Sequence, residues 1–337
     1  MNLEERIEAL HQLGEYLANL NEEELDELTW KAGNQNSWFT PEHVQRAISG
    51  IRNFLDRDVL KSFTSNYQLS DQHPAKTIGI VMAGNIPLVG FHDLLCVLLS
   101  GNRALIKPSS TDTFLMRHIT DKLIEIDHRL EQNVLFAEKL EGMDAIIATG
   151  SDNTARYFEY YFAKYPHIIR KNRTSIGILN GSENAQAFES LGKDIFLYFG
   201  LGCRNVSKLY VPEGYNFSSF FEAIEDYKRV RDHHKYVNNY DYNKSIYLIN
   251  GVQHLDNGFL LVTASESLVS PISVLYFEEY SDGHQLKTNL ENQADKIQCI
   301  VSDQQWWPNS FDFGQAQSPA IDDYADQVDT MQFLTSL

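Results

Sequence analysis

The N-terminal part of the chain carries apolar residues three and four positions apart, the spacing that places them on one face of a helix. The residues with this spacing are Leu3, Ile7, Leu10, Leu13 and Leu17, followed by Val44, Ile48, Ile51 and Leu55. We therefore predict amphipathic helices over residues 3–32 and 41–61. A helix start signal, Thr40-Pro41-Glu42, precedes the second one. Residues 1–70 are thus expected to form an N-terminal helical segment.

From residue 77 the pattern changes to short apolar runs separated by helix-like segments. The run over 77–83, TIGIVMA, is typical of a strand buried in a parallel sheet, and Pro87 suits the first turn of the helix after it. Further strands are predicted at 103–106, 133–136 and 145–148, and helices up to 99, at 111–127 and at 152–163. This alternation predicts a doubly wound parallel α/β domain, which we place at residues 71–170.

The alternation resumes after residue 170 and predicts a second α/β domain over residues 171–305. Its strands are expected at 175–179, 207–211, 245–250, 258–262, 272–277 and 297–301, and its helices at 185–199 and 217–227. Residues 306–337 are polar and turn-rich. We interpret them as a C-terminal arm that packs on a partner subunit or, alternatively, as an ordinary surface tail.

Composition narrows the classes of partner. The 337 residues include 46 acidic and 28 basic ones, a net charge of −18, which disfavours nucleic acid and anionic membranes. Three widely spaced cysteines without a CxxC motif suggest neither a disulfide framework nor a zinc site, and they fit the reducing cytoplasm. The acidic N-terminus does not resemble a signal peptide, and no apolar run is long enough to span a membrane.

A cysteine in a glycine-containing turn is the strongest candidate for chemistry. Cys203 follows Gly200, Leu201 and Gly202 and precedes a predicted strand, with the basic Lys208 five positions further on. A thiol held beside backbone N–H groups is suited to nucleophilic attack on an acyl group. The alternative is a small buried residue before a strand, because free cysteine is common in cores.

Three polar segments follow strands of the first predicted sheet, at the edge where ligands bind in folds of this class. Gly84 and Asn85 follow the first strand and place an amide side chain there. Lys107 ends the next strand and suits a ribose or phosphate group. Gly150 and Ser151 precede a helix whose first N–H groups attract anions. Simpler interpretations are helix caps for Asn85 and Ser151 and an exposed lysine before a turn for Lys107.

Standard nucleotide-binding and hydrolase signatures are absent. The chain has no GxGxxG, GxxxxGK[ST], HExxH or GxSxG motif. His233 and His234 lie in a basic-rich stretch without a third ligand spaced near them. We therefore interpret that stretch as a solvated helix or turn and predict no metal site.

Taken in order, these segments resemble the aldehyde dehydrogenase superfamily. The succession is a strand ending in Asn-x-Pro, a strand ending in Lys-Pro-Ser, Thr-Gly-Ser at a helix start, and Gly-x-x-Cys. Within that superfamily, the stretch AGNIPLVGFHDLLCVLLSGNRALIKPSS is most similar to bacterial acyl-CoA reductases of the Lux fatty-acid reductase type. The resemblance covers roughly residues 75–275. Residues 265–272 resemble a later family segment that contacts the cofactor ribose, with Ser267 in the expected register and Glu266 one position away.

The departures from the family pattern bear on the reaction. Leu201 stands where the family commonly has glutamine, and Ala155 stands where a glycine of the cofactor helix is expected. Residues 171–177, KNRTSIG, contain no acid where hydrolytic members have the glutamate that activates water. An acylating reductase requires that absence, because its acyl group must meet hydride or a thiol rather than water.

The resemblance implies two α/β domains of aldehyde dehydrogenase type, with the active site between them, and a homo-oligomer would fit it. The implied activity is reduction of an acyl-CoA or acyl-carrier thioester to an aldehyde by NADPH, with NADH as the second choice. Cys203 would form the thioacyl enzyme, and its backbone N–H and the Asn85 amide would hold the oxyanion. Residues 71–170 would bind the cofactor and residues 171–305 would carry the catalytic cysteine.

The resemblance also assigns cofactor contacts. Lys107 would contact the adenosine ribose or its 2′-phosphate, Gly150 and Ser151 the pyrophosphate, and Glu266 the ribose. One alternative is another enzyme of the same superfamily, such as an acyl-phosphate reductase. In an acyl-phosphate reductase, Arg204 and Arg173 would be the cations near Cys203 for the phosphate group of the substrate. The other is a catalytically inactive scaffold that has kept the fold, for which the changes at positions 201 and 155 argue.

Overall fold

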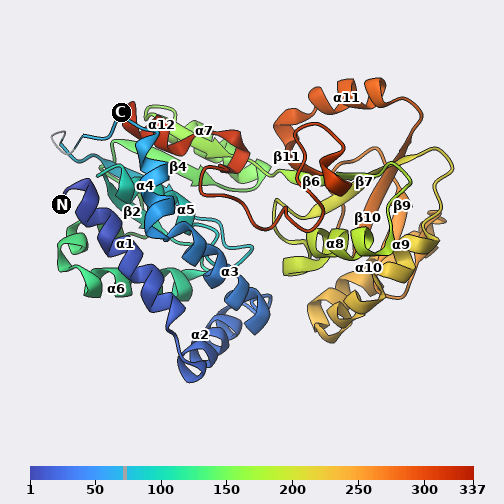
Figure 1. The fold of residues 1–337 in the computed structure, drawn as a ribbon, viewed down its shortest axis with the longest axis horizontal. Helices are drawn as coiled ribbons and strands as arrows, with labels where there is room; N and C mark the ends of the chain where they lie inside the picture. Colours follow the sequence, from blue (N-terminus) through green and yellow to red (C-terminus); the bar gives the residue numbers. More distant parts are fainter. Residues whose placement is uncertain (71–73) are drawn as a thin grey trace. The chain divides into compact units, whose positions relative to one another are not determined.

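The computed structural model describes residues 1–70 and 74–337, and these divide into two compact units (Figure 1). The first unit is formed by Met1–Asn172 together with Ala320–Leu337, and the second by Arg173–Pro319. Residues 320–337 therefore return to the unit in which the chain begins.

The first unit combines N-terminal helices with a parallel sheet. Its helices are α1 (Leu3–Ala18), α2 (Glu22–Gln35), α3 (Pro41–Phe54), α4 (Arg57–Ser65), α5 (Phe91–Leu99), α6 (Thr113–Ile126), α7 (Asp152–Phe162) and α12 (Thr330–Thr335). Its strands are β1 (Thr77–Val81), β2 (Arg103–Lys107), β3 (Val134–Phe136), β4 (Ala145–Thr149) and β5 (His167–Arg170). A short 3₁₀ helix, η1 (His128–Gln132), leads into β3.

Each long N-terminal helix predicted from the sequence is in fact two helices. The prediction over 3–32 breaks between α1 and α2, where Asn21 caps α2 through a reciprocal pair of hydrogen bonds with Glu24. The prediction over 41–61 breaks before α4, where Asp56 accepts hydrogen bonds from the first N–H groups of that helix. Side chains that satisfy the first N–H groups of a helix start a new one, so these caps override the continuous apolar spacing.

The first sheet has the strand order β3-β2-β1-β4-β5, and all of its strands are parallel. The chain runs outward from β1 to β3 and then returns to the other side of β1 at β4, so the strand order reverses between β1 and β4. Parallel sheets of this kind bind ligands at the carboxyl ends of the strands beside such a reversal. The predicted doubly wound parallel sheet is confirmed, with β5 as an edge strand that the sequence pattern did not reveal.

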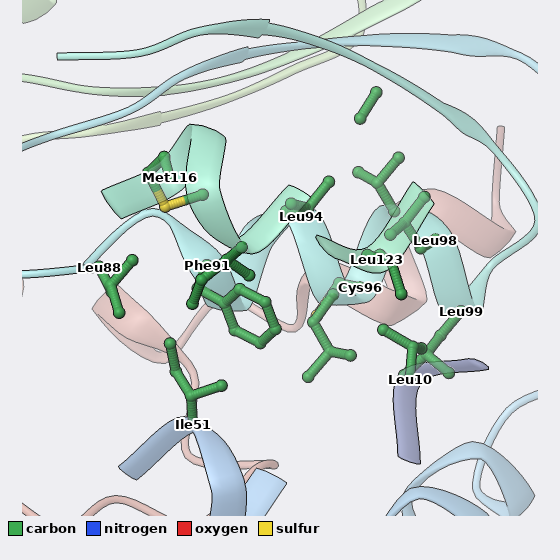
Figure 2. Close-up of a cluster of buried hydrophobic side chains, with 14 of the residues drawn as sticks. Leu10, Ile51, Leu88, Phe91, Leu94, Cys96, Leu98, Leu99, Met116 and Leu123 are labelled. Carbon is green, nitrogen blue, oxygen red and sulfur yellow. The ribbon is translucent and has the colours of Figure 1, made fainter. Parts of the chain in front are cut away.

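Helices cover both faces of this sheet. On one face, α5 lies within the core that the N-terminal helices and α6 share, and Leu10 and Ile51 belong to the same cluster as Phe91 (Figure 2). Every residue of α5 except His92 is buried, which explains its almost uniformly apolar sequence. On the other face, Phe158 and Phe162 of α7 pack against β4.

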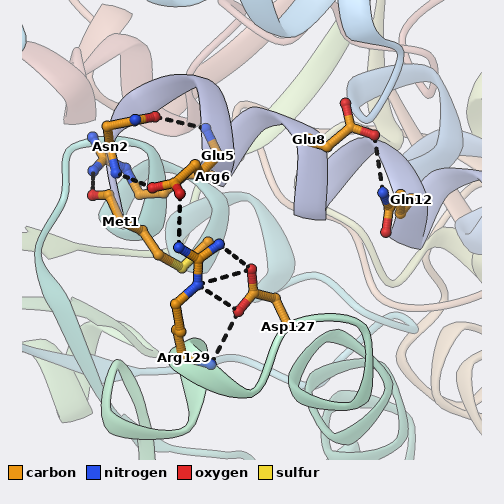
Figure 3. Close-up of polar contacts among 8 residues, drawn as sticks. All are labelled: Met1, Asn2, Glu5, Arg6, Glu8, Gln12, Asp127 and Arg129. Atoms are coloured by element: carbon orange, nitrogen blue, oxygen red, sulfur yellow. Dashed lines mark hydrogen bonds and ion pairs between the residues drawn. The ribbon is translucent and has the colours of Figure 1, made fainter.

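The N-terminus of α1 is held by a small charged network (Figure 3). Asn2 and Glu5 form a capping box, and Arg129 donates to both Glu5 and Asp127 at 2.7 Å. The hydrogen bond from Arg129 lowers the pKa of the Glu5 carboxyl. Because these groups are exposed, the network orients the helix start more than it stabilises the fold.

The C-terminal segment packs on the first unit of its own chain. Arg170, at the end of β5, donates to Asp93 of α5 at 2.7 Å and to Thr330 of α12 at 2.9 Å. Tyr324 hydrogen-bonds Tyr67 at 2.7 Å. Of the arm predicted over residues 306–337, residues 320–337 therefore contribute to the core of the first unit, whereas residues 306–319 belong to the second unit.

The second unit contains a six-stranded sheet in the order β11-β6-β7-β10-β9-β8. Its strands are β6 (Thr174–Ile178), β7 (Val206–Pro212), β8 (Leu255–Asp256), β9 (Leu261–Ala264), β10 (Val274–Tyr280) and β11 (Ile297–Val301). Its α-helices are α8 (Ala185–Phe196), α9 (Ser218–Ala223), α10 (His234–Asn250) and α11 (Gly283–Glu291). The short edge strand β8 is antiparallel to β9, and the other pairs are parallel.

Three predictions in this unit need correction. The strand expected at 245–250 is wrong, because these residues end α10, whose buried positions Tyr236, Tyr240 and Asn243 follow helical spacing. The strand expected at 258–262 begins only at Leu261, in β9. The helix expected at 217–227 stops after α9, and a 3₁₀ helix, η3 (Glu225–Asp232), follows it.

Across the part of the chain that the structure describes, no helix is long and apolar enough to cross a membrane.

Candidate active site

The first sheet brings three of the predicted site segments to one edge. β1 ends before the turn that carries Asn85, β2 ends at Lys107, and β4 ends just before Gly150 and Ser151. Neighbouring parallel strands end on the same side of a sheet, so these residues lie beside the reversal between β1 and β4. Predicted positions far apart in the sequence therefore share one ligand-binding edge.

Asn85 is exposed, and it lies in a turn rather than at the start of a helix. α5 begins only at Phe91, after Gly90, so the alternative in which Asn85 caps this helix is wrong, as is the expectation that Pro87 lies in its first turn. A side chain from the loop after β2 holds this turn: Thr111 Oγ1 donates a hydrogen bond to the carbonyl of Gly84 at 2.7 Å. A Cβ at Gly84 would lie 2.5 Å from the Thr111 hydroxyl oxygen, so only glycine fits there.

The other predicted cofactor contacts differ in their surroundings. Lys107 is exposed, and its ammonium group makes no hydrogen bond or ion pair with residues 1–70 or 74–337. Ser151 caps α7 by accepting from the N–H of Thr154 at 3.3 Å, so the capping interpretation is confirmed for its side chain. A Cβ at Gly150 would lie 3.0 Å from side-chain carbons of Thr154 and Phe158. Ala155 is the fully buried residue of α7.

These features fit a dinucleotide bound at the edge of the first sheet. An exposed lysine, a glycine that keeps the strand-to-helix turn close, and the N-terminus of α7 are groups that hold ribose and phosphate oxygens. The strand order and the reversal between β1 and β4 are those of folds that bind nicotinamide cofactors.

In the second unit, Cys203 lies in a turn between α8 and β7 and is partly exposed. Asn205 closes this turn: its side-chain oxygen accepts from the N–H of Gly202 at 2.8 Å, and its own N–H donates to the Gly202 carbonyl at 3.0 Å. Its buried amide group also donates to the carbonyls of Asp194 and Leu197, at the end of α8. Asn205 thus fixes the position of the Cys203 backbone.

The segment before Cys203 is strained. Tyr198 and Phe199 have φ angles of 53° and 55°, in the left-handed region, and Gly200 has a φ of 78°. Both aromatic side chains are buried. Left-handed conformations cost bulky residues of the order of 1–2 kcal/mol each and are concentrated at functional sites. Such angles also occur at Gln304, Gln305, Asn309, Asp326 and Gln327, but Tyr198 and Phe199 combine them with buried aromatic side chains.

The three cysteines are thiols in different environments. Cys96 is fully buried, and burial raises the pKa of its thiol well above the usual value. Cys299 is buried, and desolvation raises its thiol pKa to about 12. Ser175 lies beside both remaining cysteines: its hydroxyl is 3.0 Å from the Cys299 sulfur and from the Cys203 carbonyl oxygen. Of the three cysteines, Cys203 is the one that is partly exposed.

Lys208 takes part in holding the site together rather than in contacting a substrate. Its side chain is fully buried, and its ammonium group donates to the Glu278 carboxylate at 2.5 Å and to the Glu266 carbonyl at 3.1 Å. Its neighbour Ser207 donates to the Leu268 carbonyl at 2.6 Å. Two successive residues of β7 therefore hold the loop that carries the predicted ribose contact, Glu266, whose side chain is exposed.

Asp194 and Arg204 attach the loop over residues 311–317 beside the Cys203 turn. The Asp194 carboxyl accepts from the N–H groups of Gly314 and Ala316, and Arg204 donates to the Ala316 carbonyl. Desolvation raises the pKa of Asp194 to about 7, against the opposing effect of these two hydrogen bonds. Neither Asn205 nor Asp194 was singled out from the sequence, because the partners of their side chains lie outside any local pattern: Asn205 accepts from Gly202 before it, and Asp194 accepts from residues about 120 positions away.

The fold defined by these units is that of the aldehyde dehydrogenases. The Mycobacterium tuberculosis aldehyde dehydrogenase complexed with NAD+ matches 90% of this chain and 73% of its own with a TM-score of 0.64 at 14% identity. The P. syringae indole-3-acetaldehyde dehydrogenase AldA matches 96% of this chain and 75% of its own, with a TM-score of 0.68 and 14% identity. The fold class predicted from the sequence is thereby confirmed.

The chain belongs to the acyl-CoA reductase (LuxC) family, whose model matches residues 5–224. The long-chain acyl-protein thioester reductase of Photorhabdus laumondii is 25% identical over 146 residues, 39% of this chain and 30% of that protein. Its counterpart from Aliivibrio fischeri is 24% identical over 161 residues, 43% of this chain and 33% of that protein. The matched region spans about a third of the length of these curated relatives. The family resemblance found in the sequence is confirmed.

Proposed function

We propose that this protein reduces an acyl thioester to an aldehyde through a thioacyl intermediate on Cys203. The observation that carries the proposal is that Cys203 is partly exposed, unlike the two buried cysteines, in a turn that Asn205 closes and that residues with positive φ angles precede. This turn lies within the residues that match the acyl-CoA reductase family.

In the proposed reaction, the Cys203 thiolate attacks the carbonyl carbon of the thioester. A tetrahedral oxyanion forms and then collapses, so that the bond to the departing thiol breaks and the acyl group stays on the Cys203 sulfur. The backbone N–H of Cys203 and the Asn85 amide are the proposed donors to the oxyanion. The reduced nicotinamide, when bound, supplies a hydride to the thioacyl carbon, and breaking the carbon–sulfur bond then releases the aldehyde and the Cys203 thiolate.

We assign binding of the cofactor to residues at the edge of the first sheet and to Glu266. Lys107 is the proposed contact for the adenosine ribose or its 2′-phosphate, and the Gly150–Ser151 turn is the proposed contact for the pyrophosphate. Glu266 is proposed to contact a ribose of the cofactor. The exposed ammonium group of Lys107 and the resemblance to fatty-acid reductases favour NADPH over NADH.

The substrate is proposed to be a long-chain acyl-CoA or acyl-protein thioester, in line with the activity for which the relatives are named. Reduction of an acyl phosphate is the alternative activity, for which Arg204 and Arg173 would supply the cations near the cysteine. In the structure their guanidinium groups donate to the backbone carbonyls of Ala316 and of Ala294 and Ile297. The inactive-scaffold alternative is disfavoured by a partly exposed cysteine in a turn that Asn205 closes.

The test combines product analysis with intact mass. Wild-type protein, mixed with a panel of acyl-CoA esters and NADPH, is expected to release the aldehyde and, without NADPH, to gain the mass of one acyl group on Cys203. Cys203→Ser is expected to lose both while still binding NADPH, because an unactivated hydroxyl is a weak nucleophile near neutral pH. Reductase activity close to wild type in Cys203→Ser would overturn the covalent mechanism.

A further inference from the structure

The turn that carries Asn85 is attached at both of its ends to one short loop. At its start, Thr111 Oγ1 donates to the Gly84 carbonyl at 2.7 Å. At its end, the Asp112 carboxylate accepts from the N–H of Leu88 at 2.6 Å. Asn85, Ile86 and Pro87 are the residues between these attachment points. All of these groups belong to the first unit.

The carboxyl group of Asp112 is buried and only partly satisfied by hydrogen bonds. Asp112 is 1% exposed, and its second carboxyl oxygen is buried without a hydrogen-bond partner among the described residues. A buried carboxyl group with one acceptor unused is destabilising compared with an apolar side chain of the same size. Desolvation accordingly raises its pKa to about 7. The one hydrogen bond that this carboxyl group accepts is therefore set against a desolvation cost.

The residue that Asp112 holds is itself strained. Leu88 is buried and has a φ angle of 59°, in the left-handed region that a branched side chain rarely adopts. The hydrogen bond from its N–H to Asp112 is the contact that supports this conformation. Strain that is maintained by a dedicated buried side chain beside a ligand-binding edge is typical of preorganised sites.

We propose that Asp112, together with Thr111, is a positioning residue that holds the Asn85 amide where it can donate to the reaction's oxyanion. This inference rests on the proposed function, because it assigns a purpose to the placement of Asn85. Asp112 acts through the backbone of Leu88 and touches neither substrate nor cofactor. An oxyanion donor must already be in place when the negative charge develops on the substrate oxygen. If the turn were attached at one end only, the Asn85 amide would be less well positioned and would stabilise the oxyanion less.

The test is a double-mutant cycle on turnover with a long-chain acyl-CoA and NADPH. Asn85→Ala is expected to lower kcat by about 10²–10³, the usual effect of losing one oxyanion donor. Asp112→Ala is expected to lower kcat by about 10–100-fold with the KM for NADPH little changed, as a misplaced catalytic group would. Asp112→Asn is expected to recover most of the rate, because its amide oxygen still accepts from Leu88. In Asn85→Ala, adding Asp112→Ala is expected to change kcat by less than about twofold.

Two further measurements keep the cycle interpretable. Hydrogen exchange at the Leu88 amide is expected to accelerate in Asp112→Ala and not in Asp112→Asn, which tests the attachment without any activity. Thr111→Val is an independent way of releasing the turn, at its other end. Asp144→Ala is the matched control, since Asp144 accepts from the N–H of Thr77 at 2.7 Å at the opposite end of β1. It is expected to leave kcat unchanged.

The outcomes separate the inference from the proposed function. Wild-type turnover in Asn85→Ala would overturn the oxyanion role of Asn85 and the inference with it. A slow Asn85→Ala combined with an unaffected Asp112→Ala would overturn the inference alone. The inference would also be overturned if the fold-losses in kcat from Asn85→Ala and Asp112→Ala multiplied in the double variant. Asp112 would then act independently of Asn85.

Discussion

The side-chain amide of Asn205 donates a hydrogen bond to the carbonyl of Leu197 at 2.8 Å, which ties the turn of Cys203 to the end of α8. Asn205 is 2% exposed, and its hydrogen bonds with the Gly202 N–H and the Asp194 carbonyl are buried, so these two groups would be left in a buried site without it. We expect Asn205→Ala to lower the free energy of unfolding by about 2–4 kcal/mol, because several buried polar groups lose their partner at once.

The same substitution is expected to slow acylation of Cys203, measured by intact mass after mixing with acyl-CoA. Asn205→Asp is the informative comparison. It keeps the acceptor for the Gly202 N–H and loses the donors to the Asp194 and Leu197 carbonyls. If both variants acylate at the wild-type rate, the turn does not depend on Asn205.

The lifetime of the acyl enzyme follows from the residues near the start of the second unit. Residues 171–177 contain no carboxylate. The carboxylate paired with Lys171 is that of Glu159 in α7, outside this segment. With acyl-CoA and no reduced cofactor, we expect a long-lived acyl adduct on Cys203, because no base in that segment activates water.

Adding free coenzyme A is expected to discharge the adduct by thiol exchange, and adding NADPH to release the aldehyde. Intact mass over time, with and without each acceptor, measures both. Rapid spontaneous hydrolysis would show that a base elsewhere in the chain activates water.

Alkylation should distinguish the three thiols. With its pKa raised to about 12, Cys299 is a thiolate in only about one molecule in 10⁴ at pH 8, and Cys96 is fully buried. We expect iodoacetamide to label Cys203 at least about 100-fold faster than either. Peptide mapping after short exposure gives the three rates, and equal, slow labelling at all three would favour an inactive scaffold.

Removing the buried ion pair between Arg170, at the end of β5, and Asp93 is expected to destabilise the protein strongly. Arg170→Met leaves the Asp93 carboxylate, 12% exposed, without its cation and also removes the hydrogen bond to Thr330. We expect a loss of about 3–5 kcal/mol in the free energy of unfolding, measured by urea denaturation.

The adjacent Lys171→Met is the control for Arg170→Met. It removes an exposed pair with Glu159 and is expected to change the free energy of unfolding much less than Arg170→Met does. Equal effects of the two substitutions would mean that the Arg170 pair makes no special contribution. Faster hydrogen exchange in residues 320–337 of Arg170→Met is expected as well, since α12 loses its contact with β5.

The raised pKa of Asp112 gives stability a definite dependence on pH. Below about pH 4 this carboxyl group is protonated in both the folded and the unfolded chain. Between about pH 4 and pH 7 the unfolded chain releases the proton while the folded one keeps it, because burial raises the folded pKa to about 7. The folded state then binds more protons, so the free energy of unfolding falls as the pH rises, by about 1.4 kcal/mol per pH unit for this group.

Asp112→Asn removes this titration while keeping an acceptor for the Leu88 N–H. We expect the variant to lose less stability than the wild type between pH 5 and pH 7, measured by urea denaturation at both values. Asp194, whose pKa is also raised to about 7, still titrates in the variant, so its pH dependence is reduced rather than abolished. Identical pH dependence in the two proteins would mean that Asp112 is ionised in the fold throughout this range.

The sequence by itself determined the alternation of strands and helices and the position of the candidate cysteine. Apolar runs such as TIGIV in β1 are decided by local pattern, because a strand buried on both faces needs apolar residues at every position. The residues at the strand ends were also readable, since turn-forming glycine, asparagine and proline break those runs. Boundaries were less readable at α10, where aromatic and β-branched residues suggested a strand and helical burial prevailed.

Only the tertiary structure decided which side chains support the site. The attachment of Leu88 by Asp112 joins residues 24 positions apart, and the hydrogen bond of Arg170 to Thr330 joins residues 160 apart. Local periodicity carries no information about such pairs, because they depend on which strands and loops meet after folding. The burial of Lys208 could not be predicted for the same reason. Lysine is usually a surface residue, but this side chain is fully buried in β7, between β6 and β10, and pairs with the partly exposed Glu278 carboxylate.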